Sequence, residues 1–228
     1  MTYVFPPLPV PTLAVAGSSD LFPVHRVYCV GRNYADHARE MGGDPDKEPP
    51  FFFQKNPDQL VPSGTSIPYP PMTQDLHHEI ELVVALKSGG ENIPVERALD
   101  CVFGYGVGID LTRRDLQMAL KKLGRSWETA KAFENSGPCS ALVPAATIGH
   151  PAEGRIWLNI NGTPRQDGDL DQLIWTVPEV IASLSTLFRL APGDVIFTGT
   201  PAGVGPVAKG DVLEGGVAGV GEIRITVD

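Results

Sequence analysis

Two glutamates, Glu79 and Glu81, stand two positions apart, and this spacing could build a metal site. On a β-strand, residues i and i+2 point to the same face, so the two carboxylates would lie about 6–7 Å apart along one strand. Like charges at that distance inside a protein are unfavourable, and a divalent cation between them removes the penalty. The apolar run at 82–86 indicates that the strand is buried. For the pair taken alone, a solvated strand face with two surface acids is the alternative interpretation.

Asp110 supplies a third carboxylate, at the end of a segment in which glycine alternates with large residues (103–111). Thr112 and Asp115 follow it, and their spacing predicts a capping box and a helix start. Acids at the edge between a strand and a helix commonly point into a site. Three oxygen donors without a His or Cys ligand pattern favour Mg²⁺ or Mn²⁺ over zinc.

The histidines offer one candidate general base. His37 and Glu40 are three residues apart, so on a helix they share a face, and the carboxylate can orient and charge-stabilise the imidazole. Such a pair can activate a water molecule, and a surface His–Glu contact is the alternative. His77 and His78, beside Glu79, are expected to form hydrogen bonds at the start of a strand, with metal ligation as the alternative.

Three cations, Lys55, Arg114 and Lys131, lie in apolar or capped segments of an otherwise acidic chain. Buried cations need anions, and a substrate carboxylate and an internal salt bridge are equal alternatives. The segment 198–205, rich in glycine and following a strand, could present backbone N–H groups to an oxyanion, or could be an ordinary tight turn. It lacks the lysine–serine pair of a phosphate-binding loop, so nucleotide binding is not supported.

Composition bounds the class of protein. The chain has 228 residues, which favours one larger domain, and a net charge of −9, which argues against nucleic-acid binding. Its three cysteines have no C-x-x-C spacing and are expected to be free thiols in a reducing compartment. The N-terminal residues lack the pattern of a signal peptide, and no apolar run is long enough to cross a membrane. We therefore expect a cytoplasmic protein that binds neither nucleic acid nor a membrane.

The elements that must position these residues are mostly short strands, which fits the 25 glycines and 22 prolines. An Asn161-Gly162 turn predicts a β-hairpin, and Thr176 with Glu179 predicts a capped helix. Roughly ten strands and three or four helices, not in strict alternation, argue against a doubly wound sheet and for an α+β, mainly antiparallel or barrel-like fold. The further elements expected are a helix from Asn33 to Gly42-Gly43 and strands at 27–30, 51–55, 79–87, 103–111, 194–198 and 222–227.

Four motifs, at 29–37, 77–82, 108–115 and 198–205, together resemble the fumarylacetoacetate hydrolase family, most closely its compact fumarylpyruvate and acylpyruvate hydrolases. The resemblance implies a mainly β fold, a mixed β-sheet roll with a few short helices. It implies one catalytic domain over 25–228, on which an N-terminal segment, 1–24, packs. It also implies a homodimer.

The resemblance further implies roles for individual residues. Glu79, Glu81 and Asp110 match the ligands of Mg²⁺ or Mn²⁺. His37 and Glu40 match a water-activating dyad on a lid helix that orders over the substrate. The remaining matches are a catalytic lysine, Lys131, and the substrate-contacting residues Arg32, Lys55, Arg114, Gln117 and Thr200.

The chemistry implied is hydrolysis of a C–C bond in an acylpyruvate, with fumarylpyruvate from aromatic catabolism as the leading substrate. His37 would deprotonate a water, and Lys131 with the Thr200 turn would stabilise the oxyanion that forms. Similar relatives decarboxylate a β-keto acid such as oxaloacetate, or isomerise an unsaturated oxo-diacid, on the same metal site. A metal- or metabolite-binding protein without turnover is the alternative from a different class.

Overall fold

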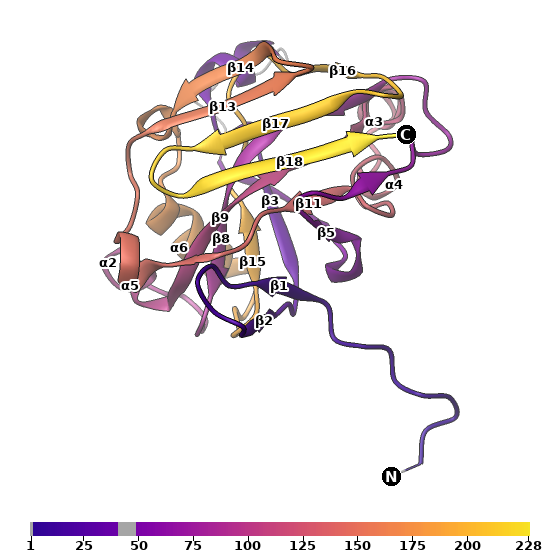
Figure 1. Cartoon of the computed structure of the whole chain (residues 1–228). Helices are drawn as coiled ribbons and strands as arrows, with labels where there is room; N and C mark the ends of the chain where they lie inside the picture. Colours follow the sequence, from indigo (N-terminus) through magenta and orange to yellow (C-terminus); the bar gives the residue numbers. More distant parts are fainter. Residues whose placement is uncertain (1, 41–48) are drawn as a thin grey trace.

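The structure, a computed structural model, describes residues 2–40 and 49–228, with the side chains of Ala38 and Glu40 left out. The helix end expected at Gly42-Gly43 lies outside the described residues. A large curled sheet and a smaller sheet pack face to face, and Figure 1 shows the smaller one lying across the strands of the larger. The predicted fold class, mainly β with a few short helices, is confirmed.

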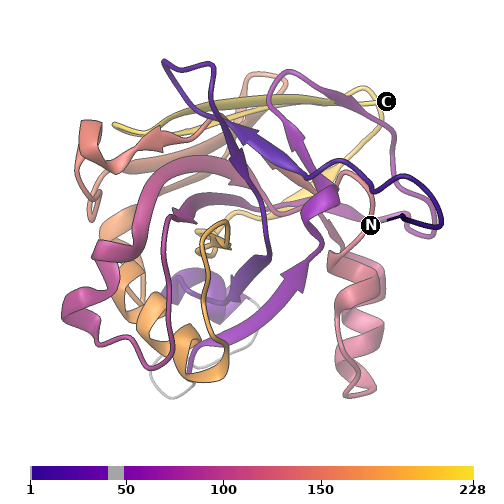
Figure 2. The same cartoon turned by 90° about the horizontal axis from the view of Figure 1, so that it is seen from below.

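The larger sheet is mixed, because β3 and β15 are parallel, as are β5 and β11, while the other neighbours along it are antiparallel. Seen from below, its strands curl around a central interior (Figure 2). In spatial order they are β4 (Phe51–Lys55), β3 (Val27–Gly31), β15 (Val195–Phe197), β8 (Ile80–Leu86), β9 (Val102–Ile109), β11 (Gly137–Cys139) and β5 (Leu60–Pro62), and β12 (Val143–Pro144) also pairs with β9.

The second sheet is built around the hairpin that Asn161-Gly162 predicts, and this prediction is confirmed. Its order is β14 (Thr163–Asp169), β13 (Arg155–Ile160), β17 (Val212–Val217), β18 (Gly221–Val227) and β6 (Ser66–Ile67). A three-stranded sheet joins β10 (Thr112–Arg113), β7 (Leu76–His78) and β16 (Gly205–Val207). The described residues thus form more strands than the roughly ten expected, because many pairings are only two or three residues long.

Successive side chains of β8 point alternately into two different apolar clusters of the core. Leu82 and Val84 face the larger apolar cluster, which also holds inward residues of the second sheet. Val83 and Ala85 face the opposite way, toward a second cluster that β1 (Thr12–Ala14) and β2 (Leu21–Pro23) cover as a hairpin. All of these residues are buried, so the strand that carries the two glutamates has little freedom to slip in register.

The helices are short and lie around the sheets. The capping box of α6 (Val177–Leu187) is confirmed, since Glu179 accepts hydrogen bonds from the backbone N–H and the hydroxyl of Thr176. The capping box expected at Thr112 is wrong. Thr112 instead belongs to β10, and Asp115 accepts a hydrogen bond from Thr73. The other helices are α1 (Ala35–Glu40), α2 (Val95–Ala98), α3 (Arg114–Lys122), α4 (Glu128–Lys131) and α5 (Ala145–Ile148), with 3-10 turns at Pro57–Gln59, Leu99–Cys101 and Leu170–Gln172.

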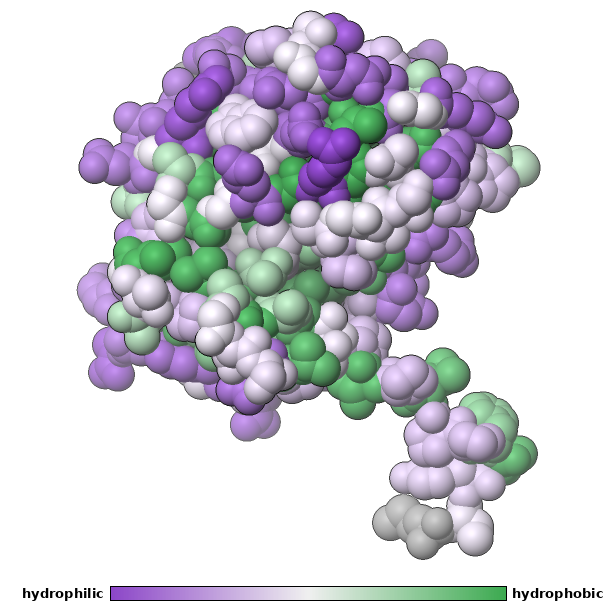
Figure 3. Space-filling view, in the orientation of Figure 1, coloured by the Kyte–Doolittle hydropathy of each residue, from purple (hydrophilic) through white to green (hydrophobic). Residues whose placement is uncertain are grey.

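The N-terminal residues before β1 extend away from the body of the molecule, with exposed apolar side chains (Figures 1 and 3). The β1–β2 hairpin, in contrast, buries Leu13 and Phe22 against the second cluster. All three cysteines are buried and free of disulfides, as expected. Among the described residues, no helix combines the length and the apolar character needed to cross a membrane.

Candidate metal centre and pocket

Three carboxylates meet at the start of β8 and the end of β9. Glu79 immediately precedes β8, Glu81 is the second residue of β8, and Asp110 directly follows β9. Each offers an oxygen, and these oxygens all lie within 4.8 Å of one another. All three residues are at most 5% exposed. The sequence spacing therefore does place the two glutamates on one buried face, and strand pairing brings Asp110 to them.

Strand register makes room for this cluster. Glu81 pairs with Gly108 of the neighbouring strand. A Cβ at Gly108 would lie 2.4 Å from the ring of Phe197 and 2.7 Å from Val83. Only glycine therefore lets β9 approach closely beside the carboxylates, which explains the glycine alternation noted in the sequence.

Three buried cations compensate the acids. The Lys131 ammonium donates to Glu79 (2.8 Å) and to Asp110 (2.6 Å). Lys55 forms an ion pair with the other oxygen of Asp110 at 2.8 Å, and the Arg114 guanidinium forms one with Glu79. Of the two alternatives for these cations, the structure contains the internal salt bridge.

Glu81 is different. Its carboxylate accepts a hydrogen bond from the backbone N–H of Gly199 at 2.7 Å, and within the described residues it forms no ion pair. Burial, followed by the neighbouring charges of Asp110 and Glu79, raises the pKa of Glu81 well above its usual range. Among the three carboxylates, Glu81 is therefore the one whose charged form its described surroundings favour least.

The pKa values of the paired groups move the other way. Burial alone would raise the pKa of Glu79, but the charges of Lys131 and Arg114 lower it below its usual range. Burial alone would lower the pKa of Lys131, but Asp110 and Glu79 raise it above its usual value. Lys131 thus stays protonated, so it can donate charged hydrogen bonds to an anion but cannot act as a general base.

A divalent cation fits these residues. Oxygen donors from three carboxylates suit Mg²⁺ or Mn²⁺, and a bound cation would offset the burial and the neighbouring negative charges that raise the pKa of Glu81. His77 and His78 are engaged elsewhere, with Asp75 and Gln166 respectively. Both histidines are therefore hydrogen-bonded, as expected, but they form the end of β7 and not the start of a strand.

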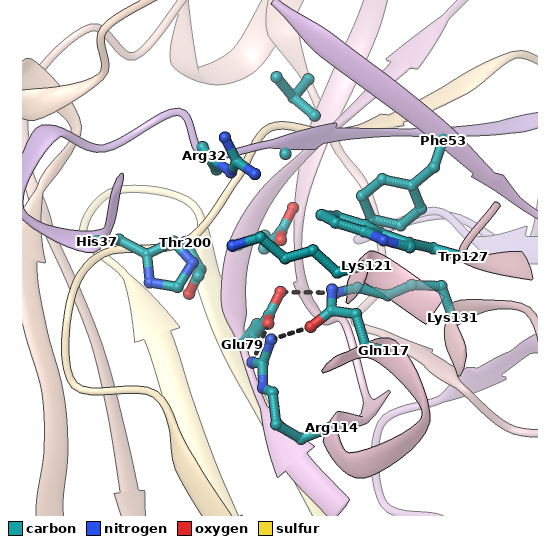
Figure 4. A pocket seen from close by; sticks show the side chains of 13 residues that line it. Arg32, His37, Phe53, Glu79, Arg114, Gln117, Lys121, Trp127, Lys131 and Thr200 are labelled. Carbon is teal, nitrogen blue, oxygen red and sulfur yellow. Dashed lines mark hydrogen bonds and ion pairs between the residues drawn. The ribbon is translucent and has the colours of Figure 1, made fainter. Parts of the chain in front are cut away.

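A pocket opens above the carboxylates, and most of the predicted site residues line it (Figure 4). His37, on α1, is only 5% exposed and lines the pocket together with Thr200. Arg32 adopts a left-handed backbone conformation (φ 59°), which is rare for a residue with a side chain and typical of functional loops. The predicted site residues in the lining are Arg32, His37, Glu79, Glu81, Arg114, Gln117, Lys131 and Thr200.

Three predicted residues are not among those that line the pocket: Asp110, Lys55 and Glu40. Asp110 is fully buried in the carboxylate cluster beneath it. Lys55 is buried behind the acids, where its ammonium also donates to the backbone carbonyls of Leu111 and Lys131. Its role as a substrate contact therefore stays a prediction. The side chain of Glu40 lies outside the described part of the structure, so the dyad with His37 also stays a prediction.

Lys121 and the aromatic residues Phe53 and Trp127 also line the pocket, although they were not predicted from the sequence. A signal for Lys121 was present. Arg114, Gln117 and Lys121 recur at i, i+3 and i+7, so they share one face of α3, and this face points into the pocket. No comparable spacing marks the aromatic pair, because its members come from β4 and the start of α4.

Replacing Lys131 by methionine is expected to lower the free energy of unfolding by about 3–5 kcal/mol. The substitution leaves Glu79 and Asp110 buried with a partner missing, and a buried charge without its partner is costly. Urea unfolding of the metal-free protein measures the change. Lys121→Met is the matched control, since this exposed lysine should cost less than about 1 kcal/mol. Equal stability of the two variants would contradict the prediction.

This chain resembles known proteins in both sequence and structure. The family described as Fumarylacetoacetate (FAA) hydrolase C-terminal matches residues 26–228. The chain is 44% identical over 189 residues to a fumarylpyruvate hydrolase of Ralstonia sp, covering 82% of this chain and 98% of that one. It is 43% identical over 201 residues to the mitochondrial oxaloacetate tautomerase FAHD1 of Mus musculus, covering 88% of this chain and 90% of that one.

The fold is also similar to a solved structure, the crystal structure of fumarylpyruvate hydrolase from Pseudomonas aeruginosa in complex with Mn²⁺ and pyruvate. The TM-score is 0.97 at 50% sequence identity, and the match covers 99% of each chain. Relatives with two different activities thus resemble this chain to a comparable degree in sequence.

Proposed function

Because the chain belongs to the fumarylacetoacetate hydrolase family, we propose that it is a metal-dependent hydrolase of acylpyruvates, with fumarylpyruvate as its substrate. The observation that carries the proposal is the buried cluster of Glu79, Glu81 and Asp110 beneath a pocket that His37 also lines. The similar structure with Mn²⁺ and pyruvate supports a divalent metal and a 2-oxo acid. Mg²⁺ and Mn²⁺ are both suitable cofactors.

The metal, held by the three carboxylates, would supply Lewis-acid stabilisation of negative charge on the 2-oxo acid end of the substrate. His37, oriented by Glu40, takes a proton from water, and the resulting hydroxide attacks the distal carbonyl carbon. The Lys131 ammonium and the Thr200 hydroxyl stabilise the oxyanion that forms there. The C–C bond then breaks, and the pyruvate enolate that leaves takes up the proton held by His37, giving pyruvate and the acid of the acyl chain.

The remaining residues bind and orient the substrate in this scheme. Arg32, Arg114 and Gln117 offer donors for carboxylate oxygens, and Lys55 holds Asp110 from behind. Phe53 and Trp127 form an apolar wall that limits access of water from one side. The catalytic domain would extend over 25–228, and a homodimer, a cytoplasmic location and a role in aromatic catabolism stay predictions.

Conversion of oxaloacetate is the second candidate, because the mouse tautomerase is nearly as similar to this chain as the Ralstonia hydrolase. Decarboxylation of oxaloacetate, or isomerisation of an unsaturated oxo-diacid, would use the same metal site. Decarboxylation needs no attacking water, so its dependence on His37 should be weak.

A substrate panel tests the proposal. Fumarylpyruvate, maleylpyruvate, acetylpyruvate and oxaloacetate are each assayed with Mg²⁺, with Mn²⁺ and with EDTA, and the products are identified by NMR. We expect the highest kcat/KM for fumarylpyruvate, and at least a roughly 100-fold loss when EDTA removes the metal. Turnover of oxaloacetate alone would replace the proposed function by the second candidate. Binding of 2-oxo acids without product would indicate a binding protein.

A further inference from the structure

The buried side-chain amide of Gln166 lies behind the pocket and contacts both Thr200 and the start of β8. Gln166 lies in β14, is 1% exposed and is not among the residues that line the pocket. We propose that Gln166 is a positioning residue that turns the hydroxyl of Thr200 into a hydrogen-bond donor toward the substrate. The inference rests on the proposed function for the role of Thr200, and the contacts of Gln166 carry the rest.

Two backbone groups fix which way the amide of Gln166 points. The N–H of Ile80 can only donate, and it donates to Oε1 of Gln166 at 3.1 Å. The carbonyl of Pro201 can only accept, and it accepts from Nε2 at 2.8 Å. If the amide oxygen and nitrogen were exchanged, the N–H of Ile80 would face another donor and the carbonyl of Pro201 would face another acceptor. The polarity of this side chain is therefore settled by its surroundings.

This polarity determines the role of Thr200. The second hydrogen of Gln166 Nε2 is donated to Oγ1 of Thr200 at 2.7 Å, so the threonine oxygen acts as the acceptor. Among the described residues, the hydroxyl makes no other hydrogen bond. Thr200 lines the pocket, so its own hydrogen is available to an oxygen bound there (Figure 4). A donor aimed in advance at developing negative charge is what an oxyanion site requires.

Close packing holds the same turn against β14. A Cβ at Gly203 would lie 2.2 Å from the carbonyl oxygen of Arg165, and one at Gly168 would lie 2.8 Å from Pro201. His78 adds a further hydrogen bond, since its Nδ1 lies 2.8 Å from Gln166 Oε1 and must be the donor. Gln166 thus fastens the Thr200 turn to the start of β8, where the carboxylates lie.

The test is a double-mutant cycle on kcat for the best substrate of the panel. Thr200→Val removes the hydroxyl and should lower kcat roughly 100-fold, with a smaller change in KM. Gln166→Met keeps the size of the side chain, removes its hydrogen bonds and should lower kcat roughly tenfold or more. In the Thr200→Val background it should lower kcat further by no more than about twofold, because the hydroxyl that it orients is gone. In the Thr200→Ser background, which keeps a hydroxyl, Gln166→Met should again lower kcat roughly tenfold or more.

Gln172→Met is the matched control. Gln172 lies six residues further along, and its amide accepts a hydrogen bond from the N–H of Asp169 without contacting Thr200. This variant should keep wild-type kcat within about twofold. Equal losses from Gln166→Met in the Thr200→Val and Thr200→Ser backgrounds would overturn the inference, because Gln166 would then act by another route.

A readout without substrate separates this inference from the proposed function. Hydrogen exchange of the amides of 199–205 should be at least about tenfold faster in Gln166→Met than in the wild type, and unchanged in Gln172→Met. Unchanged exchange in Gln166→Met would overturn the inference even if the enzyme hydrolyses fumarylpyruvate. An inactive wild type with faster exchange in the variant would refute the proposed function and leave the turn-holding role supported.

Discussion

Replacing His37 by alanine is expected to lower kcat for fumarylpyruvate hydrolysis roughly 10²–10⁴-fold, the range typical of a lost general base. The imidazole is buried and lines the same pocket as Thr200, so it is placed to activate a water beside a substrate bound there. Steady-state kinetics with saturating Mg²⁺ or Mn²⁺ measures the loss. Decarboxylation of oxaloacetate, which needs no activated water, should lose far less.

The matched control for this variant is His25→Ala. His25 forms a hydrogen bond with Asp194 and is not among the described residues that line the pocket, so kcat should stay within about twofold of wild type. Calorimetry should show unchanged affinity of His37→Ala for Mn²⁺, since His37 is not among the three proposed ligands. A kcat within twofold of wild type in His37→Ala would end the proposed mechanism.

Glu81→Gln is expected to weaken Mn²⁺ binding by roughly 100-fold or more and to lower activity at limiting metal by a similar factor, since each 1.4 kcal/mol of lost binding energy is tenfold in Kd. Glu81 is the carboxylate without a cation partner in the described chain, so its replacement unpairs no lysine or arginine. The amide oxygen can still accept from the N–H of Gly199. The metal-free variant should therefore be at least as stable as the wild type.

Asp110→Asn provides the contrast, because it also weakens the metal site but leaves Lys55 and Lys131 buried with a neutral partner. We expect this variant to lose both metal affinity and stability. Calorimetric titration with MnCl₂ and urea unfolding in EDTA separate the two effects. Wild-type Mn²⁺ affinity in Glu81→Gln would exclude this carboxylate as a ligand.

The raised pKa of Glu81 also predicts how the effect of metal depends on pH. The folded, metal-free chain holds the proton of this carboxyl more tightly than the unfolded chain does, so its stability falls as pH rises above the unfolded pKa. Bound Mn²⁺ removes that cost. The increase in Tm that Mn²⁺ produces should therefore be larger at pH 8 than at pH 5.5 in the wild type, and Glu81→Gln should show little of this difference.

Some features of the site follow from the sequence because they depend on one element at a time. The pleat of a strand places Glu79 and Glu81 on one face whatever surrounds them. The Asn161-Gly162 hairpin and the cap of α6 are equally local, because a turn or a helix end is formed by adjacent residues. The motif resemblance added the family and the fold class, and both are confirmed.

Other features depended on packing between distant segments, and the sequence alone did not determine them. The spacing at Thr112 predicted a helix cap. Thr112 instead lies in β10, which pairs with β7, and Asp115 accepts a hydrogen bond from the hydroxyl of Thr73. Lys55 and Lys131 form ion pairs with Asp110 only because β4 and α4 pack beside the residue that follows β9.

The link from Gln166 to Thr200 likewise joins strands that are far apart along the chain. Backbone geometry dictates distances within an element, whereas distances between elements depend on register and on which side chains fill the space between them. The types of residue for the chemistry were therefore visible in the sequence. Only the tertiary structure decided which of them touch and which way a buried hydroxyl can donate.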